Sequence, residues 1–147
     1  MVTRRSRVIA APVEDVWRLV ADPYAMPRWW PNAARVEGVR GDGWTTVLAN
    51  ARSGRSVRTD WRLDTSRKPS RRRWSQELDG TAFARLFARN SVEVELEPAD
   101  AGTRLTLAFH QELRGWARLA PFVIRRGMRR QLRAALEGAA RALEPGA

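Results

Sequence analysis

Cysteine is absent from the 147-residue chain, and histidine occurs only once, at position 110. Without cysteine the chain has no disulfide, no thiolate zinc site and no cysteine nucleophile. With His110 as the single imidazole, a histidine-based metal cluster is excluded as well. We therefore expect neither a metal site nor a cofactor.

Long hydrophobic runs are also missing. The longest apolar stretch, Leu119 to Ile124, is interrupted by Pro121 and is far shorter than the roughly 20 residues that span a bilayer. Segment 1–12 carries basic side chains but no sustained apolar core, so it lacks the pattern of a secretory signal peptide. These features predict a soluble, cytoplasmic protein.

Acidic residues are few beside basic ones, 16 against 27, which gives a formal net charge of +11. All the basic residues except Lys68 are arginine. An excess of positive charge is typical of nucleic-acid-binding proteins, but no zinc-finger, basic-zipper, RNA-recognition or helix-turn-helix pattern is present. The arginine bias, beside many Ala, Gly and Pro, instead indicates GC-rich coding. Charge alone does not favour nucleic acid as the partner.

The apolar content, 44% of residues with seven Trp, is sufficient for one packed domain over residues 1–147. Residues 3–10 are predicted to form a first strand. A short amphipathic helix follows over residues 13–22, because its apolar residues recur at helical spacing. Asp22 and the following proline end this helix and begin a second, very short one that runs toward residues 29–30.

From residue 34 onward the hydrophobic pattern has a period of two, with turn residues at intervals. Apolar and charged residues alternate over 57–64, and again over 92–97. One apolar and one charged face per strand predicts an antiparallel sheet with one side in water. Together with the first strand, this pattern predicts a curved antiparallel sheet of about six to seven strands, in which consecutive strands are neighbours. The predicted fold class is α+β.

Residues 121–143 have the pattern of a long amphipathic helix. Its apolar stripe consists of Ile124, Met128, Leu132, Ala135, Ala139 and Leu143. Gly127 and Gly138 share one flank, and glycine in a helix costs about 1 kcal/mol relative to alanine. We expect them to mark close approach to another backbone, and the alternative is a solvent-exposed flank with little constraint on sequence. One helix covers only part of a curved sheet, so we predict a ligand cavity between the two.

The predicted core contains residues that lie in the apolar phase of each element. They are Val16, Trp17, Val20, Leu63, Val94, Leu107, Phe109, Met128, Leu132 and Ala135.

The order of elements and several motifs resemble the START-like, or SRPBCC, superfamily. The matching segments are IAAPVEDVW at 9–17, ADP at 21–23, WWP at 29–31 with Val-Glu at 36–37, and the hairpin at 97–106. The resemblance implies a helix-grip fold like that of birch-pollen-allergen proteins. It implies ligands such as lipids, polyketides or isoprenoids, and it admits polyketide cyclase/dehydratase activity of the lyase or isomerase type. It assigns no catalytic residue, because the superfamily shares no catalytic motif.

Aromatic and apolar side chains on the predicted inner face are the candidate ligand-binding residues, and they serve equally well as ordinary core. They are Trp29, Trp30, Trp61, Trp74, Phe87, Phe109, Ile124 and Met128. Trp29 and Trp30 are adjacent in a helical turn, so one is expected to face inward and the other to lie at the rim. The face of Phe87 depends on whether a bulge occurs between Phe83 and Asn90.

Gln76, Asn90 and Gln111 are in phase with the apolar residues of three strands, which predicts that they face inward. Buried amides need partners, so they either bond one another or meet a polar ligand atom. If the protein is an enzyme, these three are the candidate catalytic residues, because amide N–H groups stabilise enolate or alkoxide charge. His110 is expected on the solvent face and is not a candidate base.

Arg126, Arg129, Arg130 and Arg133 are predicted to form an exposed positive strip on the last helix. A solvated helix face is the simplest interpretation. The more specific hypothesis is docking to an anionic membrane or an acidic carrier protein, with the arginines at 71–73 extending the surface.

Three functional hypotheses follow. The favoured one is binding of a small, largely apolar molecule in the cavity, with cyclase/dehydratase-like activity as an extension. The second is a dedicated cyclase/dehydratase enzyme of a biosynthetic pathway. The third is a basic adaptor that docks acidic partners or membranes without using the cavity.

Overall fold

A computed structural model describes residues 1–50 and 52–145. The strands are β1 (Val2–Ile9), β2 (Ala33–Arg40), β3 (Gly43–Ala49), β4 (Ser56–Arg67), β5 (Arg71–Gln76), β6 (Phe87–Ala99) and β7 (Gly102–Leu113). The α-helices are α1 (Val13–Val20) and α2 (Pro121–Leu143), and the 3₁₀ helices are η1 (Pro23–Arg28), η2 (Ala82–Arg85) and η3 (Gly115–Leu119).

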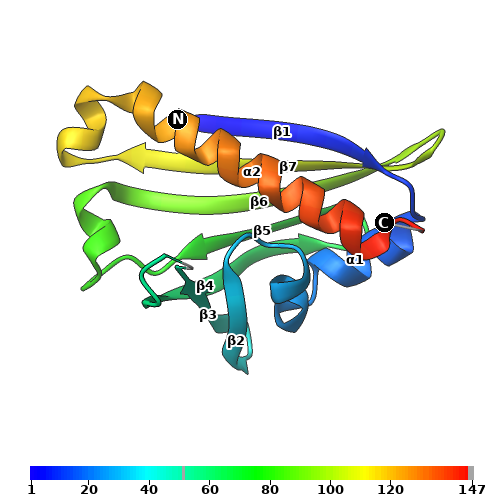
Figure 1. Cartoon of the computed structure of the whole chain (residues 1–147), viewed down its shortest axis with the longest axis horizontal. Coiled ribbons are helices and arrows are strands. Elements are labelled where there is room, and N and C mark those ends of the chain that lie inside the picture. The colour runs from blue at the N-terminus through cyan, green and yellow to red at the C-terminus, as the bar shows by residue number, and fades with distance from the viewer. Residues whose placement is uncertain (51, 146–147) are drawn as a thin grey trace.

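The seven strands form one antiparallel sheet in the order β1-β7-β6-β5-β4-β3-β2 (Figure 1). Strands β2 to β7 pair consecutively, and β1 pairs with β7 at the far edge. The α+β helix-grip fold predicted from the sequence is confirmed. None of the helices within the described residues is long and apolar enough to cross a membrane.

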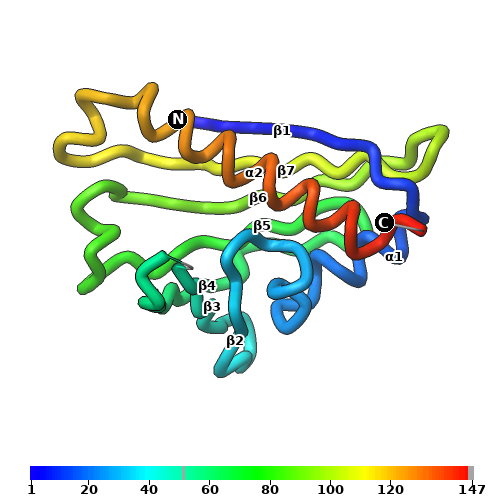
Figure 2. Tube along the Cα trace, in the orientation of Figure 1, coloured from blue at the N-terminus to red at the C-terminus, as the bar shows by residue number. Residues whose placement is uncertain are grey.

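The two faces of the sheet differ as the alternating pattern predicts. On β6, Val92, Val94 and Leu96 are buried, and they pair in register with Phe109, Leu107 and Leu105 of β7. These residues form the concave face, over which α2 lies (Figure 2). The helix runs along β1 and β7 and reaches α1 and η1 near its C-terminal end.

The buried side of α2 is wider than the predicted stripe. Leu132, Ala135 and Ala139 are fully buried, and Arg129 and Arg133 are exposed, as predicted. Leu136 and Ala140 are also buried, because the C-terminal half of the helix contacts the sheet edge on one side and α1 and η1 on the other.

Eight of the ten predicted core residues are buried. Leu63 and Met128 are only partly buried, and they pack against the core from its margin.

The expectation that one of Trp29 and Trp30 lies at the rim is wrong. Both are buried, with 2% and 6% of their surface exposed. Trp29 follows η1 with an irregular backbone (φ −139°, ψ −31°), so the two neighbours do not follow helical directions. Their rings meet edge to face at a centroid distance of 5.5 Å.

The apolar interior is divided into two clusters. The main cluster contains most of the buried residues of α1, η1, α2 and the sheet. The second is small, consisting of Leu78, Phe87, Ala117 and Ile124, and lies where η2 and η3 close the other end. Met128 packs against both clusters.

Candidate functional site

The concave face is lined with aromatic rings. Six of the seven Trp residues are buried, Trp116 being the exception. The rings of Trp44 on β3 and Trp74 on β5 have centroids 6.2 Å apart and planes tilted by 59°, and Trp30 meets Phe109 edge to face at 5.9 Å. These rings are buried and pack against one another within the main apolar cluster.

The three predicted inward amides form a single hydrogen-bonded row across β5, β6 and β7. Gln111 Nε2 donates to Asn90 Oδ1 at 3.1 Å, and Asn90 Nδ2 donates to Gln76 Oε1 at 2.9 Å. Asn90 and Gln111 are directly opposite each other in the β6–β7 register. All three are at least nine-tenths buried. The prediction that the three amides face inward is confirmed, and of the two kinds of partner considered for them the structure shows bonds to one another.

When three side-chain amides bond in a row, the first amide keeps an NH₂ group and the last keeps a carbonyl oxygen that the row itself does not use. Here Gln76 Nε2 and Gln111 Oε1 have no hydrogen-bond partner among the described residues. The second contact of Gln111 Nε2 is with Met128 Sδ at 3.1 Å, and a thioether sulfur is a weak acceptor. The polar groups of the row are therefore incompletely satisfied at both ends.

Two hollows lie beside the sheet. One, of about 650 Å³, lies between α2 and the β3–β4 side of the sheet, and its lining includes Leu48, Val57, Phe83 and Gln131. The other, of about 470 Å³, lies where β5 and β6 separate, and its lining includes Gln76, Asn90 and Leu78. Its lining also includes Arg73, Ser75 and Ser91, which alternate with the inward residues of β5 and β6, so this hollow reaches Gln76 and Asn90 from the outer side of the sheet.

The predicted ligand-binding residues are distributed over both apolar clusters. Trp29, Trp30, Trp61, Trp74 and Phe109 belong to the main cluster. Phe87 and Ile124 belong to the second cluster, and Met128 touches both. Whether they contact a ligand stays a prediction.

The bulge that decides the face of Phe87 is present. The β6–β7 register shifts between Phe87 and Arg89, and the extra residue places Phe87 and Asn90 on the same side of β6. Phe87 is consequently 6% exposed.

Sequence reasoning missed Trp44, Phe83 and Gln131. Trp44 is opposite Trp61 in the β3–β4 register and is buried, with an unpartnered Nε1. Its alternation with Thr46 and Leu48 was the signal for an inward position. Phe83 and Gln131 line the larger hollow, and nothing in the local pattern distinguishes them.

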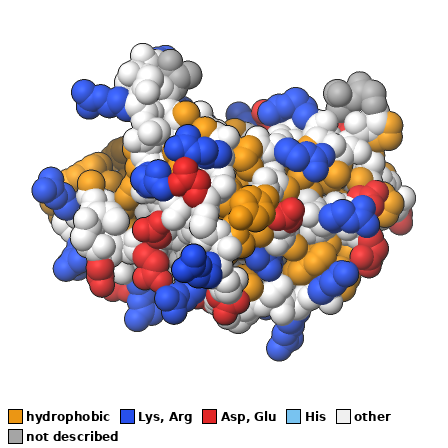
Figure 3. Space-filling view, turned by 90° about the horizontal axis from the view of Figure 1, so that it is seen from below, with side chains coloured by type: hydrophobic (Ala, Val, Ile, Leu, Met, Phe, Trp, Pro, Cys, Tyr) orange, Lys and Arg blue, Asp and Glu red, His pale blue; other side chains and the backbone are white. Residues whose placement is uncertain are grey.

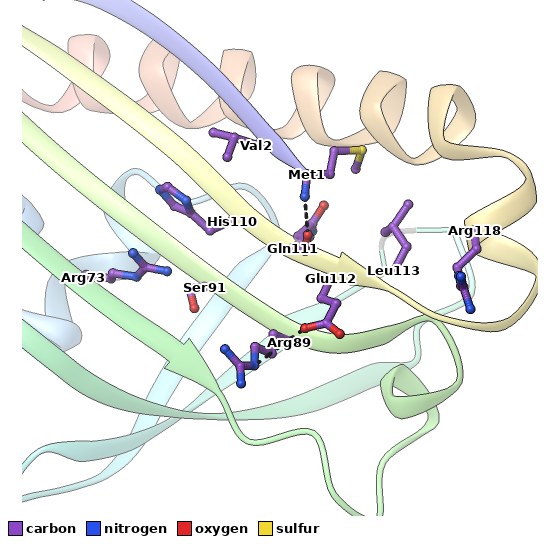
Figure 4. A pocket seen from close by; sticks show the side chains of 10 residues that line it. All are labelled: Met1, Val2, Arg73, Arg89, Ser91, His110, Gln111, Glu112, Leu113 and Arg118. Atoms are coloured by element: carbon purple, nitrogen blue, oxygen red, sulfur yellow. Dashed lines mark hydrogen bonds and ion pairs between the residues drawn. The ribbon is translucent and has the colours of Figure 1, made fainter.

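A third hollow, of about 580 Å³, lies on the opposite, convex face, and its lining includes His110, Arg73 and Ser91 (Figure 4). Although His110 is on the outer face as predicted, it is half-buried there. Its Nε2 lies 3.7 Å from a Glu93 oxygen, which is too long for a hydrogen bond. Burial and the positive charge of Arg73 lower the pKa of His110, and together they outweigh the opposing effect of Glu93.

The chain matches, over residues 2–144, the family described as polyketide cyclase / dehydrase and lipid transport. It belongs to this family. The START-like, SRPBCC resemblance inferred from the sequence is thereby confirmed. No curated protein matches the chain.

Solved structures have the same fold at low sequence identity. A START superfamily protein from Mycobacterium smegmatis is similar with a TM-score of 0.76 and 14% identity, covering 97% of each chain. A protein from Thermus thermophilus is similar with a TM-score of 0.74 and 22% identity over 97% of this chain and 96% of that one. The di-domain ARO/CYC BexL from the BE-7585A biosynthetic pathway is similar with a TM-score of 0.77 and 16% identity, covering 100% of this chain and 51% of BexL.

On this SRPBCC domain the predicted arginine strip, Arg126, Arg129, Arg130 and Arg133, is exposed. Together with Arg5 of β1, the four residues line a hollow of about 390 Å³. None of these five arginines forms an ion pair within the described part of the chain. Other arginines do form ion pairs, such as Arg71 with Glu95 at 2.8 Å. On another face of the molecule, basic and acidic side chains are interspersed (Figure 3).

The arginines at 71–73 lie on β5 and not on α2. Arg71 and Arg73 are close to Glu95 and Glu93, so their charge is offset locally. Arg72 points to the inner side, and burial lowers its pKa against the opposing effect of Asp42 and Asp22.

Proposed function

We propose that this SRPBCC domain binds a small, largely apolar molecule, of the lipid, polyketide or isoprenoid class, between α2 and the concave face of the sheet. The amide row Gln76–Asn90–Gln111 is the observation that carries the proposal. It offers hydrogen-bond capacity that the protein does not use, next to an aromatic surface. A largely apolar ligand with one or two oxygens matches that combination.

The proposed point of ligand entry is the boundary between the two apolar clusters, where Met128 lies. We call this boundary the seam. Met128 alone of the α2 side chains packs against both clusters, and its unbranched chain has several rotatable bonds. A ligand that displaces Met128 brings an oxygen to Gln111 Nε2 in place of sulfur. This exchange converts a weak contact into a stronger hydrogen bond.

The unused donor of Gln76 provides a second point of attachment. Leaving a buried polar group without a partner costs about 1–3 kcal/mol. A ligand oxygen that accepts from Gln76 Nε2 removes this cost, and the proposed complex is more stable than the free protein by a corresponding amount. An unsubstituted hydrocarbon lacks this gain and binds more weakly.

Calorimetric titration with 1,8-dihydroxyanthraquinone, a flat molecule with carbonyl oxygens, tests the proposal. Met128→Trp fills the seam and should weaken binding at least tenfold. Arg141→Trp, at an exposed position farther along α2, is the matched control and should bind like the wild type. Equal affinity of all three proteins would contradict entry at the seam, and mass spectrometry of an organic extract of the purified protein identifies the natural ligand.

A second candidate function is a polyketide cyclase/dehydratase, which the description of the family includes. Amide N–H groups in a water-poor site stabilise the negative oxygen of an enolate. They do not abstract protons at neutral pH, so the base would be a carboxylate, a water or the substrate itself. This restricts the chemistry to cyclisation or dehydration of an already reactive chain.

Single-residue variants separate the enzyme from the carrier. In the enzyme, Gln76→Met and Gln111→Met lower turnover of a poly-β-ketone substrate while melting temperatures stay within a few degrees. His110→Ala leaves turnover unchanged. Loss of turnover in His110→Ala with both amide variants active would overturn the assignment.

The arginine strip has a proposed role of its own, which is to attract an anionic surface, either lipid headgroups or an acidic carrier protein. Segment 113–136 supports this role, because it contains seven Arg and no Asp or Glu. Binding through exposed charges weakens with salt, since the screening length is about 10 Å at 0.1 M. Replacing all four strip residues with Gln should weaken the salt-dependent part of the binding markedly. If binding were unchanged, the strip would be only a solvated surface.

A further inference from the structure

Four large apolar side chains protrude together at one end of the molecule. They are Trp116 and Leu119 of η3 and Phe122 and Val123 of α2, with 56%, 85%, 72% and 49% of their surface exposed. We call these four residues the apolar tip. The other exposed large apolar residues of the described chain, Val2, Tyr24 and Val57, lie apart on β1, η1 and β4.

The tip is held firmly by its backbone. Ala117, in the middle of η3, is fully buried in the second apolar cluster. Arg114 N donates to Leu86 O at 2.8 Å, and a Cβ on Gly115 would lie 2.9 Å from Arg85 O. The exposed side chains therefore stand on an anchored turn, and their exposure is a property of the fold.

Positive charge surrounds the tip. Arg114, Arg118, Arg125 and Arg126 are exposed beside it, and none forms an ion pair within the described residues. Phe122 and Arg126 are four residues apart, so they lie on one face of α2, and the tip is continuous with the arginine strip. Figure 1 shows η3 and the first turn of α2 at the end of the molecule opposite α1.

We propose that the apolar tip inserts into the interfacial region of a bilayer that contains anionic lipids, with the arginines on the headgroups. A protruding set of apolar side chains ringed by Arg and including a Trp matches the layered chemistry of that interface. An acidic protein partner would complement the charge, but it would also need a cavity shaped for the tip. The inference rests on the proposed role of the strip and adds the kind of surface that it meets.

Co-sedimentation of the full chain with vesicles of phosphatidylcholine and phosphatidylglycerol at equal ratio tests this inference. The wild type should bind these vesicles and not vesicles of phosphatidylcholine alone. Leu119→Ser/Phe122→Ser should weaken binding at least tenfold. Tyr24→Ser, which removes a similarly exposed aromatic ring from η1, should bind within twofold of the wild type.

Tryptophan emission gives a second readout, because Trp116 is the one exposed Trp among seven. Its emission should shift to the blue when anionic vesicles are added. Trp116→Phe should lose this shift and keep most of the binding, which separates insertion of the tip from binding in general. A shift that persists in Trp116→Phe would contradict insertion at this site.

The outcomes distinguish the tip from the strip. If the four-Gln strip variant loses vesicle binding and Leu119→Ser/Phe122→Ser binds fully, the proposed role of the strip holds and insertion of the tip is wrong. A wild-type dimer that becomes monomeric in the tip variant, or capture of an acidic carrier protein without vesicle binding, also overturns it. The tip variant should bind 1,8-dihydroxyanthraquinone as the wild type does. The ligand proposal and the membrane proposal are therefore tested by separate measurements, and one can fail without the other.

Discussion

Gly138 of α2 lies directly against the backbone carbonyl of Trp29, so closely that a Cβ at Gly138 would overlap Trp29 O. No side chain fits in that space, and the helix approaches the end of η1 as closely as two backbones allow. This contact positions Trp29, and beside it Trp30, which in turn meets Phe109. A single glycine on the helix thus helps to set the aromatic wall of the concave face.

Replacement of Gly138 by alanine should destabilise the domain. The methyl group meets a backbone atom that cannot rotate away, and such overpacking costs about 1–3 kcal/mol, which outweighs the roughly 1 kcal/mol gain in helix propensity. At Gly127, nothing lies within 4 Å of the added Cβ, so Gly127→Ala is the matched control. Thermal unfolding should show a lower Tm for Gly138→Ala and an equal or higher Tm for Gly127→Ala. A stabilised Gly138→Ala would contradict the close approach.

Asn90 should contribute more to stability than either of its neighbours in the amide row. Asn90→Leu leaves Gln76 Oε1 and Gln111 Nε2 without their amide partner, whereas Gln76→Met leaves only Asn90 Nδ2 unpaired. With each such group costing about 1–3 kcal/mol, urea unfolding should show a larger loss for Asn90→Leu. Equal losses for the two variants would indicate that the row is not the connected unit described above.

The stability of the domain should depend on the protonation of His110. Its pKa is lowered in the folded state, chiefly by burial, from an ordinary value of 6.5. The unfolded chain therefore binds a proton first as the pH falls, so this contribution to stability is complete above pH 6.5 and is lost as the pH falls through the folded-state pKa. His110→Gln should lose less stability than the wild type between about pH 7.5 and 5.5.

An NMR titration measures that pKa directly, because the chain has only one histidine signal to follow. The midpoint should lie below 6.5. A midpoint at or above this value, or parallel stability curves for the wild type and His110→Gln, would show that Glu93 outweighs burial and Arg73.

Much of the fold is readable from the sequence because each element carries its own period. Helix α2 begins at Pro121 and ends at Leu143, as the apolar stripe predicts. The inward amides were also predictable, since Asn90 and Gln111 share the phase of the apolar residues that follow or precede them on β6 and β7. Periodicity determines which face a residue occupies, and here it was sufficient.

The remaining features depend on contacts between elements. Gly127 and Gly138 share a helix flank, yet only Gly138 meets another backbone, because η1 reaches one end of α2 and not the other. Met128 is in phase with the core but is left half-buried at the seam between two clusters. The irregular turn at Trp29 and the bulge before Arg89 reorient side chains locally. No single-element pattern contains this information.

The most direct test of the proposed ligand site is methyl NMR of Met128 during titration with 1,8-dihydroxyanthraquinone. If the ligand enters at the seam, ring currents should shift the Met128 methyl signal, and the side-chain amide signals of Gln111 should move with it. The ring signals of His110, on the convex face, should stay in place. Binding that shifts His110 and leaves Met128 and Gln111 unchanged would contradict a site between α2 and the sheet.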